Sequence, residues 1–335
     1  MSISSISSIA IIQLTDKHTE VMGGLISLFQ KTFSDFYIYY EGYPSHFCNY
    51  YKSVLETKNL SIHLRRHKGN PKIGHHDLYV LVTGLEYVEF NFEKWGIPSC
   101  RTLLLSHHVD QYSELKGKGA GTFAISPVYK KVPHFLTYCN LPISKKIVNE
   151  NKINIFLSGF TNPNNKDLSG LSRLFRFLEK NEITNFRFHI TNYYPIEELE
   201  KFSSICKVYV DATAKKMMKL LSDANYVMTL AKKNSSYHKK QLSGIIPLAV
   251  STGTPLIIDK DLATIYGFSK KNSVIYPFTG MNTIQDVVLS LQEISQKRYS
   301  SLRKNLIEMR KKVINKDSTR MKEYVQKILK KCRDE

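Results

Sequence analysis

Uninterrupted apolar segments with polar flanks restrict the fold of this chain more than any other feature of its sequence. "DLYVLVTG" (77–84) and "RTLLLSHH" (101–108) are apolar at consecutive positions, not at alternate ones. Strands of this kind are buried on both faces, as in a parallel sheet covered by helices. A helical spacing of apolar residues separates such strands, first in "EVMGGLISLFQKTF" (20–33). We therefore predict an α/β fold with parallel sheets.

The alternation of strands and helices runs twice along the chain. A length of 335 residues is too great for one ordinary core, so two domains are expected. The segment 129–152 contains two prolines and little periodicity, and we interpret it as a linker with the domain boundary near residue 150. The alternation restarts with the strand "KINIFLSGF" (152–160), and the segment 232–240 is predicted to be a loop.

The chain is strongly basic, because it contains 48 Lys and Arg but only 29 Asp and Glu, which gives a net charge of +19. Such a balance favours anionic partners: nucleic acid, acidic lipid surfaces or phosphorylated small molecules. Many basic residues fall in the last 40 positions, where apolar residues at helical spacing predict helices with the lysines outward. The alternative to an anionic partner is that these basic residues only form the solvated face of a terminal amphipathic helix. The apolar positions are Leu302, Ile307, Val313, Tyr324 and Ile328.

The five cysteines form no CxxC pair. Their scatter predicts neither a zinc ribbon nor a disulfide framework and favours a reducing compartment, with the cytoplasm as the default. No apolar run reaches the roughly 18 residues that span a bilayer, and we expect no signal peptide at the start. The cysteines are Cys48, Cys100, Cys139, Cys206 and Cys332.

The stretch "SGIIPLAVSTGTPLII" (243–258) predicts a loop, a buried helix, a glycine turn and a buried strand. A helix N-terminus presents unpaired N–H groups and the positive end of the helix dipole, which together attract phosphate. Ser243 adds a hydroxyl donor, Gly244 lets the backbone come close, and Ile245 begins the helix. The alternative is structural: the serine caps the helix and the glycine relieves crowding.

The same stretch resembles the diphosphate-binding helix of GT-B glycosyltransferases, whose members often read S-G-x-x-x-x-A-x-x-x-G-x-P-V-I. The matching residues are Ser243, Gly244, Ala249, Gly253 and Pro255. "INIFLSGFTNPNNKDL" (153–168) is similar to the first strand and phosphate-side loop of that family's nucleotide-sugar domain. The resemblance covers roughly residues 150 to 280, and the N-terminal half matches only in architecture.

The resemblance implies two Rossmann-like domains facing a cleft, with a C-terminal helical segment crossing back. It implies an acceptor-side domain at 1–150, a nucleotide-sugar-binding domain at 151–287 and basic C-terminal helices at 288–335. The implied activity is a metal-independent hexosyltransferase reaction without a cofactor, from a nucleotide-diphosphate sugar to an acceptor glycan or lipid-linked glycan. We expect a cytoplasmic enzyme, peripheral to an acidic membrane surface. Its motifs and composition also resemble giant-virus or algal-virus enzymes.

The resemblance places further donor-binding residues in two loops. Lys166 precedes a helix that begins near Asp167, where a cation can reach a bound phosphate. Tyr237 is expected to stack on or hydrogen-bond to the donor, and His238 and Lys240 add cations beside the diphosphate. Retaining members commonly carry two glutamates eight residues apart at the positions of Lys240 and Leu248. Their two-glutamate chemistry is therefore not transferred to this chain.

Candidate acid–base residues lie in loops that follow predicted strands of the N-terminal half, because such sheets bind ligands at the carboxyl ends of their strands. His107 resembles the strand-end histidine that many GT-B enzymes place beside the transferred sugar. The other candidates are His18, Asp110 and Asp16, with Glu20, Glu86 and His108 nearby in the same loops. Gly23 and Gly24 resemble an acceptor-side glycine loop that leaves room for substrate, although close packing would look the same.

Three alternatives stay open. A nucleic-acid-binding protein would explain the charge, but the chain has no RNP-type, zinc-finger or RGG motif, so nucleic acid is not expected as a partner. A non-catalytic or epimerase-type relative on the same fold would explain the missing glutamates. A metal site is the third, although the spacing of its candidate ligands fits no zinc signature. Those ligands are His63, His67, His75, His76 and Asp77.

Overall fold

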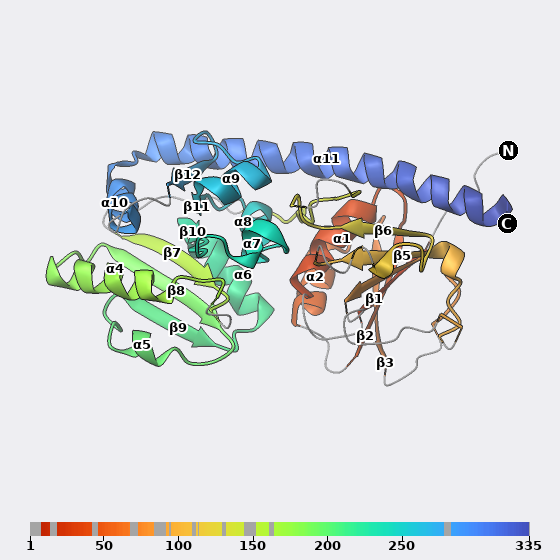
Figure 1. The fold of residues 1–335 in the computed structure, drawn as a ribbon, viewed down its shortest axis with the longest axis horizontal. Helices are drawn as coiled ribbons and strands as arrows, with labels where there is room; N and C mark the ends of the chain where they lie inside the picture. Colours follow the sequence, from red (N-terminus) through yellow and green to blue (C-terminus); the bar gives the residue numbers. More distant parts are fainter. Residues whose placement is uncertain are drawn as a thin grey trace. The chain divides into compact units, whose positions relative to one another are not determined.

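The computed structural model describes residues 8–13, 19–41, 46–67, 73–83, 92–93, 95–108, 112, 114–128, 132–143, 152–160, 164–277 and 283–334. The chain forms two compact units, whose elements are labelled in Figure 1. Unit 1 comprises Met1–Leu141, Lys240–Gly244 and Lys311–Glu335; unit 2 comprises Pro142–Lys239 and Ile245–Arg310. The boundary predicted near residue 150 lies outside the described residues. Among the described helices, none has both the length and the apolar character needed to cross a membrane.

Unit 1 is built on a six-stranded parallel sheet of order β3-β2-β1-β4-β5-β6. The order reverses between β1 and β4, the kind of switch point at which α/β sheets bind ligands. The strands are β1 (Ser8–Gln13), β2 (Asp35–Glu41), β3 (Ser61–His67), β4 (Leu78–Thr83), β5 (Thr102–Ser106) and β6 (Gly121–Ala124). The helices here are η1 (Thr19–Val21), α1 (Met22–Phe29), α2 (His46–Leu55) and η2 (Ser99–Arg101).

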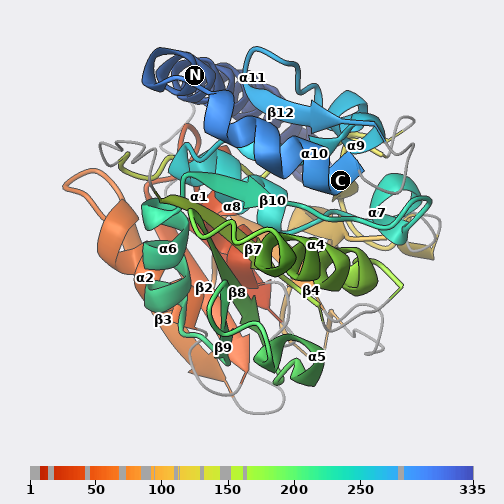
Figure 2. The same cartoon turned by 90° about the vertical axis from the view of Figure 1, so that its left-hand side faces the viewer.

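Unit 2 is likewise built on a six-stranded parallel sheet, of order β12-β11-β10-β7-β8-β9. Figure 2 shows the molecule with this unit toward the viewer. Its strands are β7 (Ile153–Ser158), β8 (Phe186–Asn192), β9 (Cys206–Val210), β10 (Tyr226–Met228), β11 (Leu256–Asp259) and β12 (Ser273–Tyr276). Its helices are α4 (Leu168–Lys180), α5 (Glu197–Glu200), α6 (Ala214–Asp223), α7 (Ser236–Lys239), α8 (Ile245–Thr252), α9 (Lys260–Tyr266), α10 (Thr283–Ser290) and η3 (Leu291–Glu293).

Local capping and turn residues fix where the helices of unit 2 begin and end. Asp167 caps α4 by accepting from Gly170 N at 2.9 Å, and Asp259 caps α9 by accepting from Leu262 N at 2.9 Å. The turn between α8 and β11 needs a glycine, because Gly253 has φ +64°. The glycine turn predicted in the 243–258 stretch is thus present.

The C-terminal helix α11 (Gln296–Asp334) is a single helix of 39 residues. It begins in unit 2, where the Arg303 guanidinium donates to Gly253 O at 3.0 Å, and it belongs to unit 1 from Lys311 onward. In unit 1, Asp317 accepts from Leu136 N at 2.9 Å and the Arg320 guanidinium lies over the Phe135 ring. The predicted C-terminal segment that crosses back is confirmed, as one long helix.

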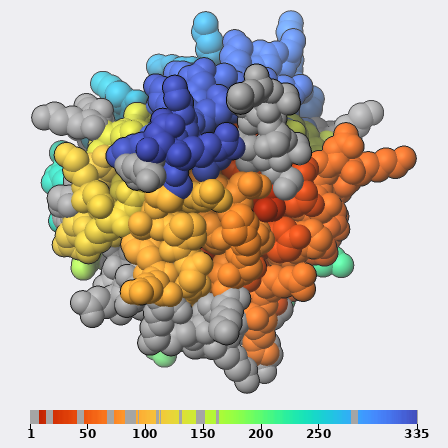
Figure 3. Space-filling model, turned by 90° about the vertical axis from the view of Figure 1, so that its right-hand side faces the viewer, coloured from red at the N-terminus to blue at the C-terminus, as the bar shows by residue number. Residues whose placement is uncertain are grey.

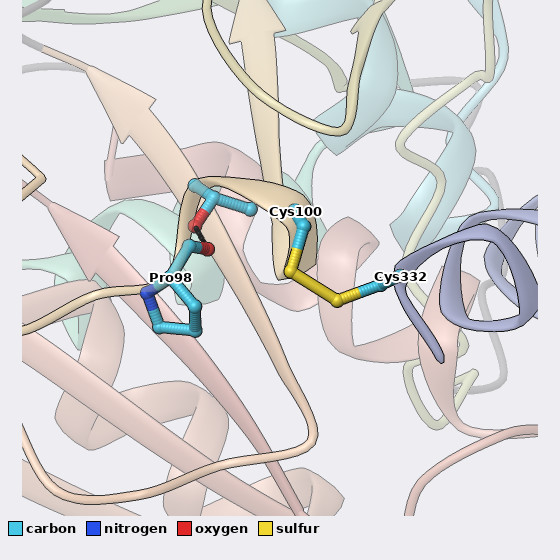
Figure 4. The surroundings of a disulfide bond; sticks show 4 residues. Pro98, Cys100 and Cys332 are labelled. Carbon is cyan, nitrogen blue, oxygen red and sulfur yellow. Dashed lines mark hydrogen bonds between the residues drawn. A yellow bond between two sulfur atoms is a disulfide. The ribbon is translucent and has the colours of Figure 1, made fainter. Parts of the chain in front are cut away.

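A disulfide joins two distant parts of unit 1, contrary to the expectation from cysteine spacing. Cys100 in η2 pairs with Cys332 in the last turns of α11, with 5.3 Å between their Cα atoms (Figure 4). The Thr102 hydroxyl donates to Pro98 O at 2.8 Å and fixes the turn that carries Cys100. The pair is 232 residues apart in sequence, so no local spacing could indicate it. Because disulfides persist in oxidising compartments, the scattered cysteines no longer favour a reducing compartment.

Candidate functional site

A buried polar cluster lies where β10 and β11 of unit 2 end. We call it the Lys166 cluster: Lys166, Ser235, Tyr237, His238 and Asp259. Asp259 is the last residue of β11 and is 0% exposed. Its Oδ1 lies 3.2 Å from His238 Nε2, and His238 Nδ1 lies 3.1 Å from Ser235 Oγ. With Nε2–H donating to the carboxylate and the serine hydroxyl donating to Nδ1, both ring nitrogens are satisfied and the imidazole has one orientation.

Lys166 is the cation of this cluster and is only 3% exposed. Its Nζ donates to Thr229 O and lies 5.5 Å from the centre of the Tyr237 ring. Burial lowers the pKa of Lys166 to about 7, while the Asp259 carboxylate acts in the opposite direction. This lysine therefore changes its charge near neutral pH, which is typical of functional lysines in an anion site.

Three residues predicted from sequence to bind the donor thus come together in one cluster: Lys166, Tyr237 and His238. The loop before α4 supplies the first, and the short helix α7 supplies the other two. A backbone bridge between Lys166 and Ala231 joins the two loops. Asp259 was not predicted, although an acid at the end of the aliphatic segment "PLIID" is the signal that could have revealed it.

A second group of predicted residues lies in unit 1, around the segment Lys240–Gly244. His108, just beyond β5, forms a backbone bridge with Gln241. A Cβ built on Gly244 would lie 2.8 Å from Glu20 Oε1, so the Glu20 carboxyl group packs directly against this glycine. The Glu20 carboxyl group thus lies at the residue pair that precedes α8, and the binding of a phosphate by this pair stays a prediction. Ser243 is 2% exposed and Ile245 is buried as the first residue of α8, whereas Lys240 is exposed.

His107 is the candidate base that the structure describes, since Asp16, His18 and Asp110 lie outside the described residues. It directly follows β5 and is 5% exposed. Its Nε2 is 2.8 Å from Val82 O, which can only accept, so the Nε2 proton is donated to this carbonyl. The neutral ring then carries its acceptor lone pair on Nδ1, which is the form a general base needs.

Close packing accounts for the two glycines of α1. A Cβ on Gly23 would lie 2.4 Å from the Tyr51 ring, and one on Gly24 would lie 2.1 Å from Thr137 O. Every residue of α1 is buried. The packing alternative therefore suffices to explain these glycines, and their predicted contact with an acceptor stays a prediction.

Two of the histidines considered as metal ligands, His63 and His76, have other partners in the structure. His76 is buried, with Nε2 3.0 Å from Tyr39 Oη and Nδ1 3.3 Å from Ser8 Oγ. Desolvation, aided by the neighbouring His75, lowers the pKa of His76 to about 4. His63 stacks on Tyr37 with 4.5 Å between ring centres. In the described part of the chain, no three His, Cys, Asp or Glu side chains are grouped as a metal site requires.

Comparisons with known proteins give similarity in structure only. No protein-family model matches the chain, and no curated protein matches its sequence. Among solved structures, HepE of Anabaena in complex with UDP and glucose superposes with a TM-score of 0.62 over 96% of this chain and 99% of that one, at 9% identity. A glycosyltransferase from Rickettsia africae gives 0.61 over 98% and 99%, also at 9% identity. The fold is the GT-B fold.

A third solved structure with this fold differs in its bound molecules. It is an α-glucosyltransferase in complex with UDP and a 13-mer DNA containing a HMU base, with a TM-score of 0.61 over 93% of this chain and 100% of that one, at 12% identity. The fold class implied by the 243–258 motif is confirmed by these matches and by the two parallel sheets. Identities this low show the fold and leave the substrates to be argued from the residues.

Proposed function

We propose that this protein is a glycosyltransferase that moves a hexose from a nucleotide-diphosphate sugar to a hydroxyl of an acceptor glycan or lipid-linked glycan. The Lys166 cluster is the observation that carries this proposal. It gathers a titrating lysine, an oriented histidine and an aromatic ring where the strands of a GT-B sheet end, the position at which such sheets bind nucleotides. The UDP bound by HepE and by the α-glucosyltransferase in complex with DNA supports a nucleotide sugar as partner.

In the proposed reaction, the acceptor oxygen attacks the anomeric carbon and the bond to the diphosphate oxygen breaks. The Lys166 ammonium binds the leaving nucleoside diphosphate, whose negative charge increases as that bond breaks, and His238, held by Asp259 and Ser235, lies beside it in the same cluster. His107 takes the proton of the acceptor hydroxyl on Nδ1, so a glycoside, a nucleoside diphosphate and one proton are the products. We propose a metal-independent reaction in a membrane-peripheral enzyme of viral source.

Incubation with a panel of nucleotide sugars tests the function directly. Release of free nucleoside diphosphate from one member, in chelator and with a hydroxyl acceptor present, is the expected result. A nucleic-acid-binding protein would instead bind duplex or single strands with a steep salt dependence and leave every nucleotide sugar intact. A non-catalytic relative would bind a nucleoside diphosphate without any turnover.

Gly244→Val is expected to abolish the binding of UDP and GDP, because a branched side chain fills the space that a phosphate needs beside the start of α8. The fold should tolerate the change, because the nearest atom to a Cβ is the flexible end of Glu20, at 2.8 Å. Calorimetry measures the affinity, and a cooperative unfolding transition confirms the fold. Gly74→Val is the control, since the nearest atom to its Cβ is 3.6 Å away. Unchanged affinity in folded Gly244→Val would refute the phosphate assignment.

The outward face of α11 in unit 1 is strongly basic, and Figure 3 shows the end of this helix, in blue, at the surface of the unit. Its exposed charged residues are Lys311, Lys312, Lys316, Lys322, Lys327, Lys330, Lys331 and Arg333, against Glu323 and Asp334. No apolar residue of this part of α11 is exposed, so any docking is electrostatic. We propose an acidic lipid surface as the partner, with a contribution of about 1 kcal/mol from each basic residue near the surface.

Vesicles containing acidic lipid are expected to co-sediment the protein at low salt, and raised salt should release it. Replacing Lys322, Lys327 and Lys330 by glutamine should weaken the binding by about a hundredfold or more, from the contribution per residue. Vesicles of neutral lipid are the control. Failure of acidic vesicles to bind the wild-type protein at low salt would contradict membrane docking.

A further inference from the structure

Asp259 is a buried carboxylate whose hydrogen bonding is incomplete. Its Oδ1 accepts from Leu262 N at 2.9 Å and lies 3.2 Å from His238 Nε2, whereas Oδ2 has no hydrogen-bond partner in the described structure. A fully buried carboxylate oxygen without a donor lowers stability. The cap on α9 needs only one oxygen, which asparagine would supply equally well. The negative charge therefore calls for a reason other than capping.

The groups that face this carboxylate come from several elements of unit 2. They are Lys166 from the loop before α4, His238 from α7 and Tyr276 from β12. Tyr237 of α7 contacts Lys166, and Asp167, at the start of α4, acts on Tyr276 as well. Burial, with Asp259 as the next cause, raises the pKa of Tyr276, so this phenol stays neutral. Lys166 is thus the group of this cluster whose charge depends on Asp259 near neutral pH.

We propose that Asp259 is a positioning residue for the donor, whose buried carboxylate orients His238 and favours the protonated form of Lys166, and that diphosphate binding is coupled to proton uptake by this lysine. The proposal rests on the function proposed above and adds to it the residue that controls the charge of the site. A bound diphosphate favours the ammonium form, because it places negative charge beside the lysine. Above pH 7 the free site has largely lost this proton, so binding must restore it.

The sign of the pH dependence follows from this linkage. Diphosphate affinity should fall as pH rises above 7, by up to about tenfold for each pH unit when one proton is taken up. The terminal phosphate of the ligand is fully ionised there, because its second pKa is about 6. Removal of the Asp259 charge lowers the pKa of Lys166 further. The curve of diphosphate affinity against pH then shifts to lower pH.

Asp259→Asn tests the proposal, with Asp261→Asn as the matched control. Asparagine keeps the cap on α9, and Asp261 is an exposed acid two residues further along. Calorimetry with UDP and GDP between pH 6.5 and 9, in buffers of different ionisation enthalpy, reports both affinity and proton uptake. We expect the wild-type protein and Asp261→Asn to take up a proton on binding above pH 7. Asp259→Asn should bind about tenfold more weakly at pH 7.5, as for a shift of about one pKa unit.

A second measurement needs no ligand: NMR titration of ¹³C-labelled lysines, with Lys166 assigned from Lys166→Met. We expect Lys166 to titrate near pH 7 in the wild-type protein and at lower pH in Asp259→Asn. An unchanged Lys166 titration in Asp259→Asn, or an unchanged affinity profile for UDP and GDP, would overturn the role of Asp259 and leave the proposed function standing. Absence of binding of any nucleoside diphosphate to the wild-type protein would overturn both.

Discussion

His107→Ala should lower turnover by about 10²-fold or more, the usual scale for losing an acid–base group. The imidazole is held by its bond from Nε2 to Val82 O, so the acceptor nitrogen has a defined direction before substrate arrives. Nucleotide affinity should hardly change, because the proposed diphosphate ligands of unit 2 are untouched. Steady-state rates with the active nucleotide sugar measure the first effect, and calorimetry with UDP or GDP measures the second. His108→Ala is the control, since its backbone makes the bridge to Gln241.

Three outcomes would contradict this assignment in different ways. Full turnover in His107→Ala would move the role of base to Asp16 or Asp110. Loss of nucleotide affinity with unaltered turnover would mean that the donor and acceptor sides are reversed. Equal losses in His107→Ala and His108→Ala would indicate a disturbed loop instead of a lost base.

Gly24→Ala should destabilise unit 1 severely. A Cβ at this position would lie 2.1 Å from Thr137 O, a backbone atom that can move only if the chain around it moves. Overpacking usually costs about 1–3 kcal/mol, and a backbone obstacle places this change at or above the upper limit. Chemical denaturation measures the loss, with Gly74→Ala as the control because its Cβ would meet only ordinary contacts. Unchanged stability with lost acceptor binding would support the substrate role of this glycine over packing.

The buried strands could be predicted from sequence because their apolar runs are continuous. "DLYVLVTG" and "RTLLLSHH" contain β4 and β5, which lie between other strands of the sheet and whose described side chains are buried. The edge strand β3 was missed, since "SIHLRRH" has Ile62 buried but ends in exposed arginines. Helix α2 was missed as well, because "HFCNYYKSVL" is rich in residues that favour strands.

The site could be predicted only in part, because sequence identifies residue types and not their directions. Lys166 was predicted as a cation that reaches a phosphate, but neither its burial nor the bond from its ammonium group to Thr229 O could be predicted from the sequence. The burial that lowers its pKa, and the carboxylate of Asp259 that opposes this effect, both depend on long-range packing. The segment 232–240, expected to be a loop, contains the short helix α7 (Ser236–Lys239), which orients His238 toward Asp259.

The disulfide between Cys100 and Cys332 makes most of this polypeptide a covalent ring. All of unit 2 and the strand β6 lie within the 232-residue loop that it closes, and only the segment before Cys100 and three residues after Cys332 lie outside. A protease that cuts once in a loop of unit 2 would therefore not divide the oxidised protein. Both halves would stay joined through η2 and the end of α11 until a thiol reductant opened the ring.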